Sequence, residues 1–231
     1  MRRVAEPELM IRREQVIAYS EGDFSEGEKN FIKFINNYLK KNKVKLTSDD
    51  LIVDLGCGPG NITEKLSLRW PYANILGIDG SDEMILQAEN NKIKNKSIGA
   101  LTNLNYLCAD IKKLKLKDLT PYKNIRLLVS NSLIHHITHV DEFFEFIKTL
   151  STKDTINFHK DLIRPKNEKR AIELKVKCAE EFSNILADDF YASLKASYTK
   201  IELKTKILER NLSSLDLIED DNKYLIVYGK V

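Results

Sequence analysis

Three glycines spaced two residues apart directly follow an apolar run in the segment IVDLGCGPGNI, residues 52–62. Glycine permits positive φ and lets a ligand pack against bare main chain, and a helix that starts just after such a turn offers free N–H groups. We therefore expect a ligand to lie against this turn. The alternative is a tight turn that serves only the packing of a helix on a strand, and the glycines alone leave it open.

The spacing of the glycines narrows the kind of ligand. Counted from Gly56, the dinucleotide pattern G-x-G-x-x-G finds Gly58 in the right place but Asn61 where its third glycine belongs. The G-K-[ST] sequence of a phosphate-binding Walker loop is also missing. What remains is D-x-G-x-G-x-G, which starts at Asp54.

Acidic residues stand at the ends of the next two predicted strands. Asp79 follows ILGI about 20 residues past the glycines, where a carboxylate can hold two ribose hydroxyls. Asp110 follows YLCA, and its side chain or the amide of Ile111 can contact an adenine edge. Each acid taken singly is more often a helix cap or a surface charge. Together they indicate one crevice at the carboxyl edge of a sheet, where ligands of open α/β sheets bind.

Histidines and charged residues follow the fourth and fifth predicted strands. An imidazole of His135 or His136 can orient or deprotonate a substrate there, and the alternative is a packed or exposed histidine. Asp161 and Arg164 can hold a polar acceptor or pair with each other in the RP turn. His135 and His139 have i,i+4 spacing, but without a third ligand or a HExxH pattern we expect no metal ion.

Five apolar segments predict the strands that position these residues: 51–55, 74–78, 104–108, 125–130 and 154–158. Helical periodicity between the first three strands and over 140–150 indicates alternation of strands and helices, hence parallel strands with right-handed crossovers. LDLI and YLIVYG, separated by EDDNK, predict an antiparallel hairpin at one edge of the sheet.

Further helices are predicted at both ends of this core. SEGE at 25–28 and TKIE at 199–202 read as capping boxes, and Ser81 as an N-cap. The apolar residues from Ala171 to Ile185 recur on one face of what reads as a single longer helix.

Composition favours an ordinary soluble protein. The chain has 231 residues with 42% hydrophobic content and a net charge of +3, which predicts one domain with small additions and argues against nucleic acid as the main partner. Lysine runs at 40–45, 92–96 and 112–117 are typical of solvated loops. The three cysteines form no CxxC pair, and neither a signal peptide nor an apolar run of about 18 residues is found, so we expect a cytoplasmic location and no membrane.

Four segments together resemble the class I S-adenosylmethionine (SAM)-dependent methyltransferases: VDLGCGPGN (53–61), GIDGSDEMI (77–85), CADI (108–111) and SNSLIHHI (130–137). The resemblance implies an α/β fold with a Rossmann-like, mostly parallel seven-stranded sheet, helices on both faces and a C-terminal antiparallel hairpin. It also implies an N-terminal helical cap (1–45) and a SAM-binding methyltransferase domain (46–231) with a helical insertion at about 165–198.

By this resemblance the glycine turn faces the methionine part of SAM, Asp79 the ribose and Asp110 the adenine, while Ser130 and Asn131 line the pocket near the sulfonium. The expected cofactor-binding residues are Asp54, Gly56, Cys57, Gly58, Gly60, Asn61, Asp79, Gly80, Ser81, Met84, Asp110, Ile111, Asn131, Ser132 and Tyr19, the last in an N-terminal lid. The expected catalytic residues are His135, His136 and Asp161, and the expected acceptor-binding residues are Arg164, Tyr191 and Ser193. S-adenosylhomocysteine (SAH) would be the product.

A narrower likeness adds EPELM (6–10), EQVIAYSEGDF (14–24), DLIRP (161–165) and DFYASLKASYT (189–199), which are similar to a group of bacterial methyltransferases whose substrate we cannot name. Where that group has an apolar strand before DLIRP, this chain has NFHK, which leaves the effect of His159 and Lys160 open.

We expect methyl transfer by in-line displacement to a small-molecule acceptor, by a monomer or a homodimer. An RNA or protein methyltransferase, favoured only by the lysine runs, and a non-catalytic SAM- or SAH-binding protein are the alternatives.

Overall fold

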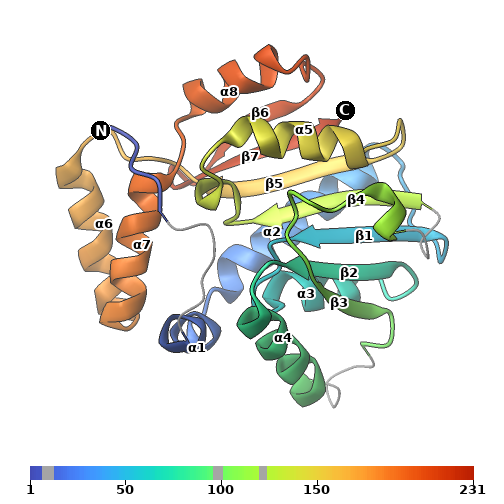
Figure 1. Cartoon of the computed structure of the whole chain (residues 1–231), viewed down its shortest axis with the longest axis horizontal. Coiled ribbons are helices and arrows are strands. Elements are labelled where there is room, and N and C mark those ends of the chain that lie inside the picture. The colour runs from blue at the N-terminus through green and yellow to red at the C-terminus, as the bar shows by residue number, and fades with distance from the viewer. Residues whose placement is uncertain (7–12, 96–100, 120–123) are drawn as a thin grey trace.

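A single seven-stranded sheet forms the centre of the computed structural model, which describes residues 1–6, 13–95, 101–119 and 124–231 (Figure 1). Its order is β3-β2-β1-β4-β5-β7-β6. The bounds are β1 (Asp50–Leu55), β2 (Asn74–Asp79), β3 (Leu104–Cys108), β4 (Asn124–Asn131), β5 (Ile156–Leu162), β6 (Asp216–Asp220) and β7 (Tyr224–Lys230). The first five strands pair in parallel, and β7 is antiparallel to both β5 and β6. The predicted mostly parallel sheet with a C-terminal hairpin is confirmed.

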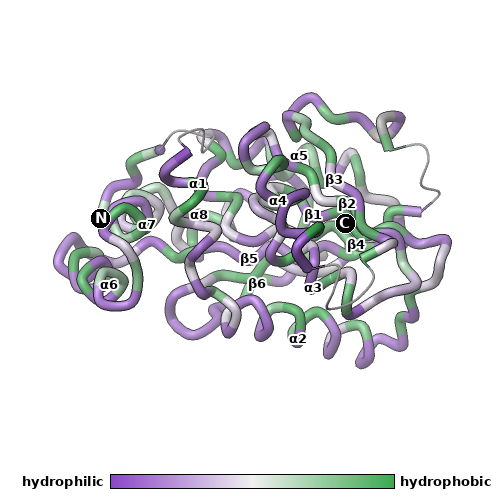
Figure 2. Tube along the Cα trace, turned by 90° about the horizontal axis from the view of Figure 1, so that it is seen from below, coloured by the Kyte–Doolittle hydropathy of each residue, from purple (hydrophilic) through white to green (hydrophobic). Residues whose placement is uncertain are grey.

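The sheet is covered on both faces because its strands are apolar on both sides. Along β1, Leu51 and Val53 pack in the cluster that includes α5 (Val140–Leu150) and α8 (Lys200–Glu209). Ile52, which points the other way, packs in the cluster that includes α2 (Ser25–Lys41) and α3 (Asn61–Arg69). Two-sided burial is typical of parallel strands. In Figure 2 the tube of α2 alternates between hydrophobic and hydrophilic colours, as an amphipathic helix should.

A group of helices lies beyond the carboxyl ends of the parallel strands. It consists of α1 (Arg13–Glu21), α6 (Glu168–Glu181) and α7 (Asn184–Ala196), as Figure 1 shows. Helix α7 packs against α6, α1 and the short 3-10 helix η2 (Ile134–His136), while α4 (Asp82–Asn95) packs along β2 and β3, and a second 3-10 helix, η1 (Leu116–Leu119), precedes β4. Within the described residues, every helix is too short or too polar to cross a membrane.

The segment 171–185 is two helices, so the prediction of one longer helix is wrong. Helix α6 ends at Glu181, and Phe182 adopts an extended backbone. Ser183 then acts as the N-cap of α7, because its hydroxyl accepts a hydrogen bond from the N–H of Leu186 at 3.3 Å. A serine that can bond the next turn in this way competes with continuation of the preceding helix.

Only one of the two predicted capping boxes forms. The hydroxyl of Thr199 accepts from the N–H of Glu202, and the Glu202 carboxylate accepts from the N–H of Thr199 at 2.8 Å. Ser25 instead lies inside α2, where its N–H donates to Asp23 at 2.9 Å. The box is lost because Glu28 is buried and bonded to α3.

His159 and Lys160 point to opposite faces of β5. The His159 ring is fully buried, with Nδ1 at 2.9 Å from the hydroxyl of Ser130 and its edge against Phe143. Lys160 extends Nζ to Asp220 at 2.8 Å. The histidine therefore belongs to the core and the lysine to the β5–β7–β6 edge, which answers the question raised by the NFHK segment.

We predict that His159 contributes acid sensitivity to the fold. Burial lowers its pKa to about 3 from 6.5, so its contribution to stability is complete above pH 6.5 and is lost as the pH falls from 6.5 toward 3. The free energy of urea unfolding of the wild type should fall by about 2 kcal/mol more between pH 7 and pH 5 than that of a His159→Gln variant, in which every other titrating group is retained. Equal pH dependence of the two proteins would contradict the prediction.

Candidate functional site

The three turn glycines all adopt positive φ, with values of 63° at Gly56, 53° at Gly58 and 89° at Gly60. Two of them are also required by the protein's own side chains. A Cβ at Gly56 would lie 2.6 Å from Leu133, and one at Gly60 would collide with the hydroxyl of Tyr106. The bare backbone at these two positions is therefore explained by internal packing, which is the alternative that the sequence left open.

Gly58 differs from its two neighbours because its outer side is open. The nearest atom to a Cβ there is the sulfur of Met84, at 3.9 Å. The N–H of Gly58 donates to Asp79 Oδ2 at 2.9 Å, and the N–H of Ser81 donates to Asp79 Oδ1 at 2.9 Å. The Asp79 carboxylate thus joins the turns after β1 and β2 beside bare main chain. Burial raises its pKa, and the backbone hydrogen bonds oppose that rise.

Other predicted residues of the turn face inward and hold its shape. The buried Asp54 carboxylate accepts from the hydroxyl of Thr63 at 2.6 Å, and burial raises its pKa to about 7. The Cys57 thiol is buried, which raises its pKa, and its N–H donates to the carbonyl of Ile78 at 3.0 Å. Asn61 donates to Glu28 of α2 at 3.1 Å. The thiol of Cys57 thus faces the core, and the side-chain amide of Asn61 faces α2.

The residues after β2 and β3 lie at the same edge. The Ser81 hydroxyl accepts from the N–H of Met84 at 3.4 Å, which confirms its predicted capping role, and Gly80 lies half-buried beside it. Asp110 is exposed and accepts from the N–H of Lys112 at 3.0 Å, while Ile111 packs partly buried against the core. The edge is open enough at Asp110 for a base to approach.

Three lysines of the runs at 92–96 and 112–117 contact neighbouring groups. Lys92 Nζ donates to the carbonyl of Leu104 at 2.6 Å, and Lys113 pairs with Asp110 at 3.3 Å. Lys112 pairs with Glu142 at 3.5 Å. These contacts tie surface segments together and agree with the interpretation of the runs as solvated faces.

The end of β4 is fixed to β5 by an unusual backbone. Ser132 has φ of 58°, rare for a residue other than glycine, and its N–H donates to the carbonyl of Lys160 at 2.9 Å. Asn131 lies half-buried just before it, with its amide 3.5 Å from the Ser132 hydroxyl. The Ser130 hydroxyl is turned into the core toward His159, so the prediction that it lines the pocket is wrong.

A buried polar cluster follows directly. His135 Nδ1 lies 2.5 Å from Asp161 Oδ1, and the N–H of His135 donates to Asp161 Oδ2 at 3.1 Å. On its other side, His135 Nε2 is 3.5 Å from Glu6 Oε1, which is also 3.3 Å from His136 Nδ1. The Ser193 hydroxyl of α7 donates to the same Glu6 oxygen at 3.2 Å. We call these residues, Glu6, His135, His136, Asp161 and Ser193, the histidine cluster.

Opposing effects act on the two central groups of the histidine cluster. Burial lowers the pKa of His135, but the charge and hydrogen bond of Asp161 and the charge of Glu6 raise it, and the net shift is upward. Burial raises the pKa of Glu6, an effect that His135 opposes. Sequence reasoning brought His135, His136, Asp161 and Ser193 to this region but missed Glu6, whose one signal was its place in the EPELM segment.

Two predicted acceptor-binding residues, Arg164 and Tyr191, make side-chain contacts within the protein. Arg164 bonds Glu202 at 2.6 Å and the carbonyl of Ser197 at 3.2 Å, so the alternative in which it pairs with Asp161 is not what the structure shows. The Tyr191 hydroxyl donates to Glu168 of α6. The side chains of Tyr191 and Ser193 lie on different faces of α7, because residues two apart on a helix point to different sides. Of the three predicted acceptor-binding residues, Ser193 is therefore the one whose side chain contacts the histidine cluster.

Tyr19 lies on α1, the helix that packs against α4 and α7. Burial raises the pKa of its hydroxyl, and the charges of Glu28, Asp54 and Asp161 add to the rise. Its ring lies 5.0 Å from that of Phe24. Its predicted place in an N-terminal lid over the cofactor stays a prediction.

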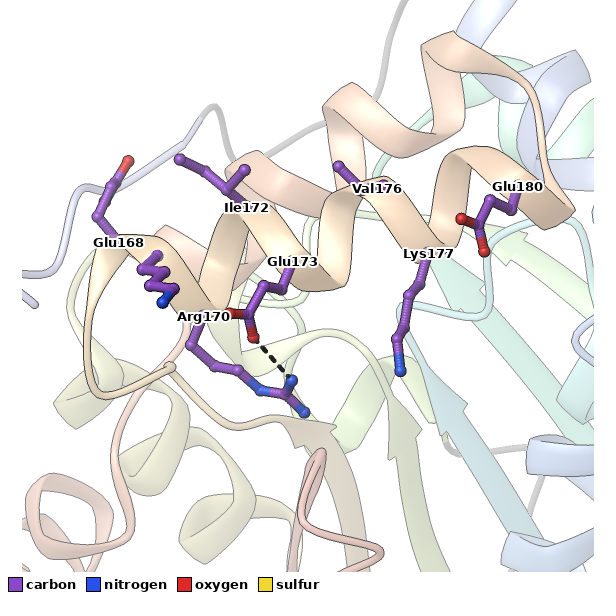
Figure 3. A pocket seen from close by; sticks show the side chains of 8 residues that line it. Glu168, Arg170, Ile172, Glu173, Val176, Lys177 and Glu180 are labelled. Atoms are coloured by element: carbon purple, nitrogen blue, oxygen red, sulfur yellow. Dashed lines mark hydrogen bonds and ion pairs between the residues drawn. The ribbon is translucent and has the colours of Figure 1, made fainter.

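A separate hollow runs along the outer side of α6 and involves neither half of this site (Figure 3). Ile172 and Val176 are exposed there among charged residues, and Arg170 pairs with Glu173 at 3.1 Å. Its lining comes entirely from one helix, so it lacks the convergent groups of a binding site.

Residues 46–224 match the sequence model of the family described as "Methyltransferase domain", and the chain belongs to this family. Among curated relatives, trans-aconitate 2-methyltransferase of Escherichia coli O157:H7 is 33% identical over 108 residues, which cover 47% of this chain and 37% of the relative. The enzyme of the same name from Streptomyces avermitilis is 33% identical over 108 residues, 46% of this chain and 37% of the relative. The matched part is thus little more than a third of these relatives' length.

Solved structures share the fold over nearly the whole chain. A SAM-dependent methyltransferase from Aquifex aeolicus superposes with a TM-score of 0.64 at 16% identity and covers 95% of this chain and 98% of its own. The plantazolicin methyltransferase BpumL, solved with a pentazolic desmethylPZN analog and SAH, gives a TM-score of 0.68 at 17% identity, with 95% and 91% covered. At this identity the likeness shows the fold, including the seven-stranded sheet with its antiparallel hairpin.

We predict that alanine is tolerated differently at two of the turn glycines. Gly58→Ala should cost about 1–2 kcal/mol of unfolding free energy, the strain of a left-handed residue with room for its Cβ. Gly60→Ala should cost clearly more, because its Cβ collides with Tyr106. Tyr106→Phe should recover part of that loss, since the buried Tyr106 hydroxyl has no hydrogen-bond partner among the described residues. Urea unfolding of the variants measures all three effects, and equal losses at both glycines would contradict them.

Proposed function

We propose that this protein is a SAM-dependent methyltransferase that acts on a small-molecule acceptor. The observation that carries the proposal is the Asp79 carboxylate, held by two backbone N–H groups beside the open face of Gly58. It lies next to the point where the strand order reverses between β1 and β4, where open α/β sheets bind their ligands. The family match and the SAH bound in the plantazolicin methyltransferase support the choice of cofactor.

The residues present fit this cofactor. Asp79 has lone pairs left for ribose hydroxyls, and the open side of Gly58 leaves room that a Cβ would fill. Asp110 and Ile111 stand at the next strand end for the adenine, and Met84 packs beside Gly58. When bound, SAM supplies a methyl group that leaves its sulfonium by in-line displacement.

The histidine cluster is the part of the chain that we propose for holding the acceptor. Its two histidines follow β4, the strand next to β1, and Asp161 lies near the end of β5, the next strand along. Helix α7, which carries Ser193, packs against the histidine segment η2. Asp161 fixes the ring of His135, while the side chain of His136 is partly exposed. Positioning alone can supply on the order of 7–11 kcal/mol toward such a displacement.

A small acceptor agrees with the surface and with the relatives. Lys92, Lys112 and Lys113 of two predicted patches contact neighbouring acids or a carbonyl, which weakens the argument for RNA at these two patches. Trans-aconitate is the substrate in the name of the curated relatives, and it is a small molecule. We propose a cytoplasmic location on the basis of the three free cysteines.

We predict that Asp79→Ala weakens SAH binding by a few kcal/mol at most, because a charged hydrogen-bond acceptor for the ribose is lost. Gly58→Ala should weaken it as well, since the added Cβ enters the space of the ligand. Asp154→Ala, a matched change at the opposite edge of the sheet, should leave affinity unchanged. Calorimetric titration with SAH measures the three variants, and unchanged affinity in Asp79→Ala would refute the ribose assignment.

Methyl transfer itself is tested by incubating the protein with labelled SAM and metabolite pools. We predict a methylated small molecule, with turnover reduced at least tenfold in His136→Ala and in Asp161→Asn while SAH affinity is kept. Tight SAH binding without any methylated product would favour the non-catalytic binder. Full activity in both variants would remove the histidine cluster from the site.

A further inference from the structure

Three potential metal-ligand atoms converge in the histidine cluster from two distant parts of the chain. They are Glu6 Oε1, His135 Nε2 and His136 Nδ1, and all lie within 4.8 Å of one another. His135 is buried, and the Glu6 and His136 side chains are 12% and 16% exposed. The arrangement is therefore enclosed on most sides and accessible on one.

The hydrogen bonds of Asp161 decide how His135 faces Glu6. Asp161 accepts backbone N–H bonds from His135 at 3.1 Å and from Leu162 at 2.6 Å, so its carboxylate acts as an acceptor on both oxygens. The proton between Asp161 Oδ1 and His135 Nδ1 therefore belongs to the imidazole. Nε2 is therefore the ring nitrogen that His135 turns toward Glu6, at 3.5 Å from Oε1, and the nitrogen that can ligate an ion there.

The distances fit a shared cation better than direct hydrogen bonds. The separations of 3.5 and 3.3 Å from Glu6 Oε1 to the two imidazole nitrogens exceed the usual N–H···O range of about 2.7–3.2 Å. Ligand atoms that each lie about 2.0–2.2 Å from one metal ion are separated by roughly 3 to 3.6 Å at octahedral or tetrahedral angles. A proton on His135 can bridge one of these gaps, whereas a metal ion bridges both.

We propose that Glu6, His135 and His136 bind a divalent first-row transition metal ion, with Asp161 as the carboxylate that orients His135. Two imidazoles and one carboxylate form a donor set suited to such ions and leave positions open for further ligands. A histidine that ligates through one nitrogen and donates its other N–H to a carboxylate is the usual supporting arrangement of metal sites. The set differs from the His135/His139 pair considered in the sequence, because His139 is exposed at the start of α5.

The segment that carries Glu6 is fixed by contacts unrelated to any ligand. The Arg3 guanidinium donates to the carbonyls of His135 and Ile137 at 3.2 and 3.0 Å and lies 4.1 Å above the ring of Tyr198. The N–H of Val4 donates to the carbonyl of Lys195 at 3.0 Å. These bonds hold residues 1–6 against η2 and α7, which brings the Glu6 carboxylate to the two histidines before any ion is bound.

The coordination positions that Glu6, His135 and His136 do not fill would be available to the methyl acceptor. Oxygen atoms of a carboxylate or hydroxyl acceptor can occupy them, so the ion would anchor the acceptor beside the expected methyl donor. This role rests on the proposed function, whereas binding of the ion does not.

Titration of the purified, chelator-treated protein with Co²⁺ tests the proposal. We expect one Co²⁺ per chain with visible absorption bands of a nitrogen- and oxygen-ligated ion, and competition by Zn²⁺. Glu6→Gln, His135→Ala and His136→Ala should each weaken Co²⁺ binding at least tenfold. Asp161→Asn, which acts through His135, should weaken it about 10- to 100-fold.

His139→Ala is the matched control from the same segment and should bind Co²⁺ as the wild type does. SAH calorimetry on every variant checks that the variant is folded and that its cofactor site is intact. If the wild type binds Co²⁺ but not SAH, that result would count against the proposed function and not against the ion. Absence of stoichiometric Co²⁺ binding to the wild type would overturn the proposal. So would NMR evidence that His135 carries protons on both ring nitrogens in the presence of excess Co²⁺, since an imidazolium would then fill the gap.

Discussion

Parallel pairing of β1 with β2 and β4, and of β4 with β5, is the constraint on which the site depends. It places the ends of four strands at one edge, so that the glycine turn, Asp79 and the histidines after β4 become neighbours. The Asp79 carboxylate accepts hydrogen bonds from the turn after β1 and from the turn after β2, which locks these two strand ends together. A slip of one residue between these strands would turn each of these side chains to the opposite face of the sheet.

The two halves of the site are built in different ways. The glycine half is local, since it comes from consecutive strand ends whose turns bond each other. The histidine half is assembled from residues that lie far apart in the sequence: Glu6 near the N-terminus, the histidines after β4, Asp161 in β5 and Ser193 in α7. Glu6 lies outside the residues 46–224 that match the family, whereas the other members of the histidine cluster lie inside them.

Burial of charge in the histidine half has an energetic consequence. Asp161 and Glu6 are both removed from most of the solvent, and two carboxylates around one imidazole are costly without compensation. Backbone N–H groups supply part of that compensation at Asp161, and a serine hydroxyl supplies part at Glu6. Such an arrangement is expected where selection acts on a site and not on stability alone.

Local patterns in the sequence were sufficient to predict the sheet. Apolar runs and turn glycines reflect backbone preferences between near neighbours in the chain, and the tertiary contacts agree with those preferences here. The local patterns located the strands, the hairpin, the Thr199 capping box and the acid at the end of β2. They failed where a residue has competing partners at long range. Glu28 left its expected capping box for Asn61 and Lys65, Arg164 bonded Glu202 and not Asp161, and Ser130 turned to His159. Only the tertiary structure could show which glycine is open and which carboxylate reaches the histidines, since both depend on side chains from elements that are distant in the chain.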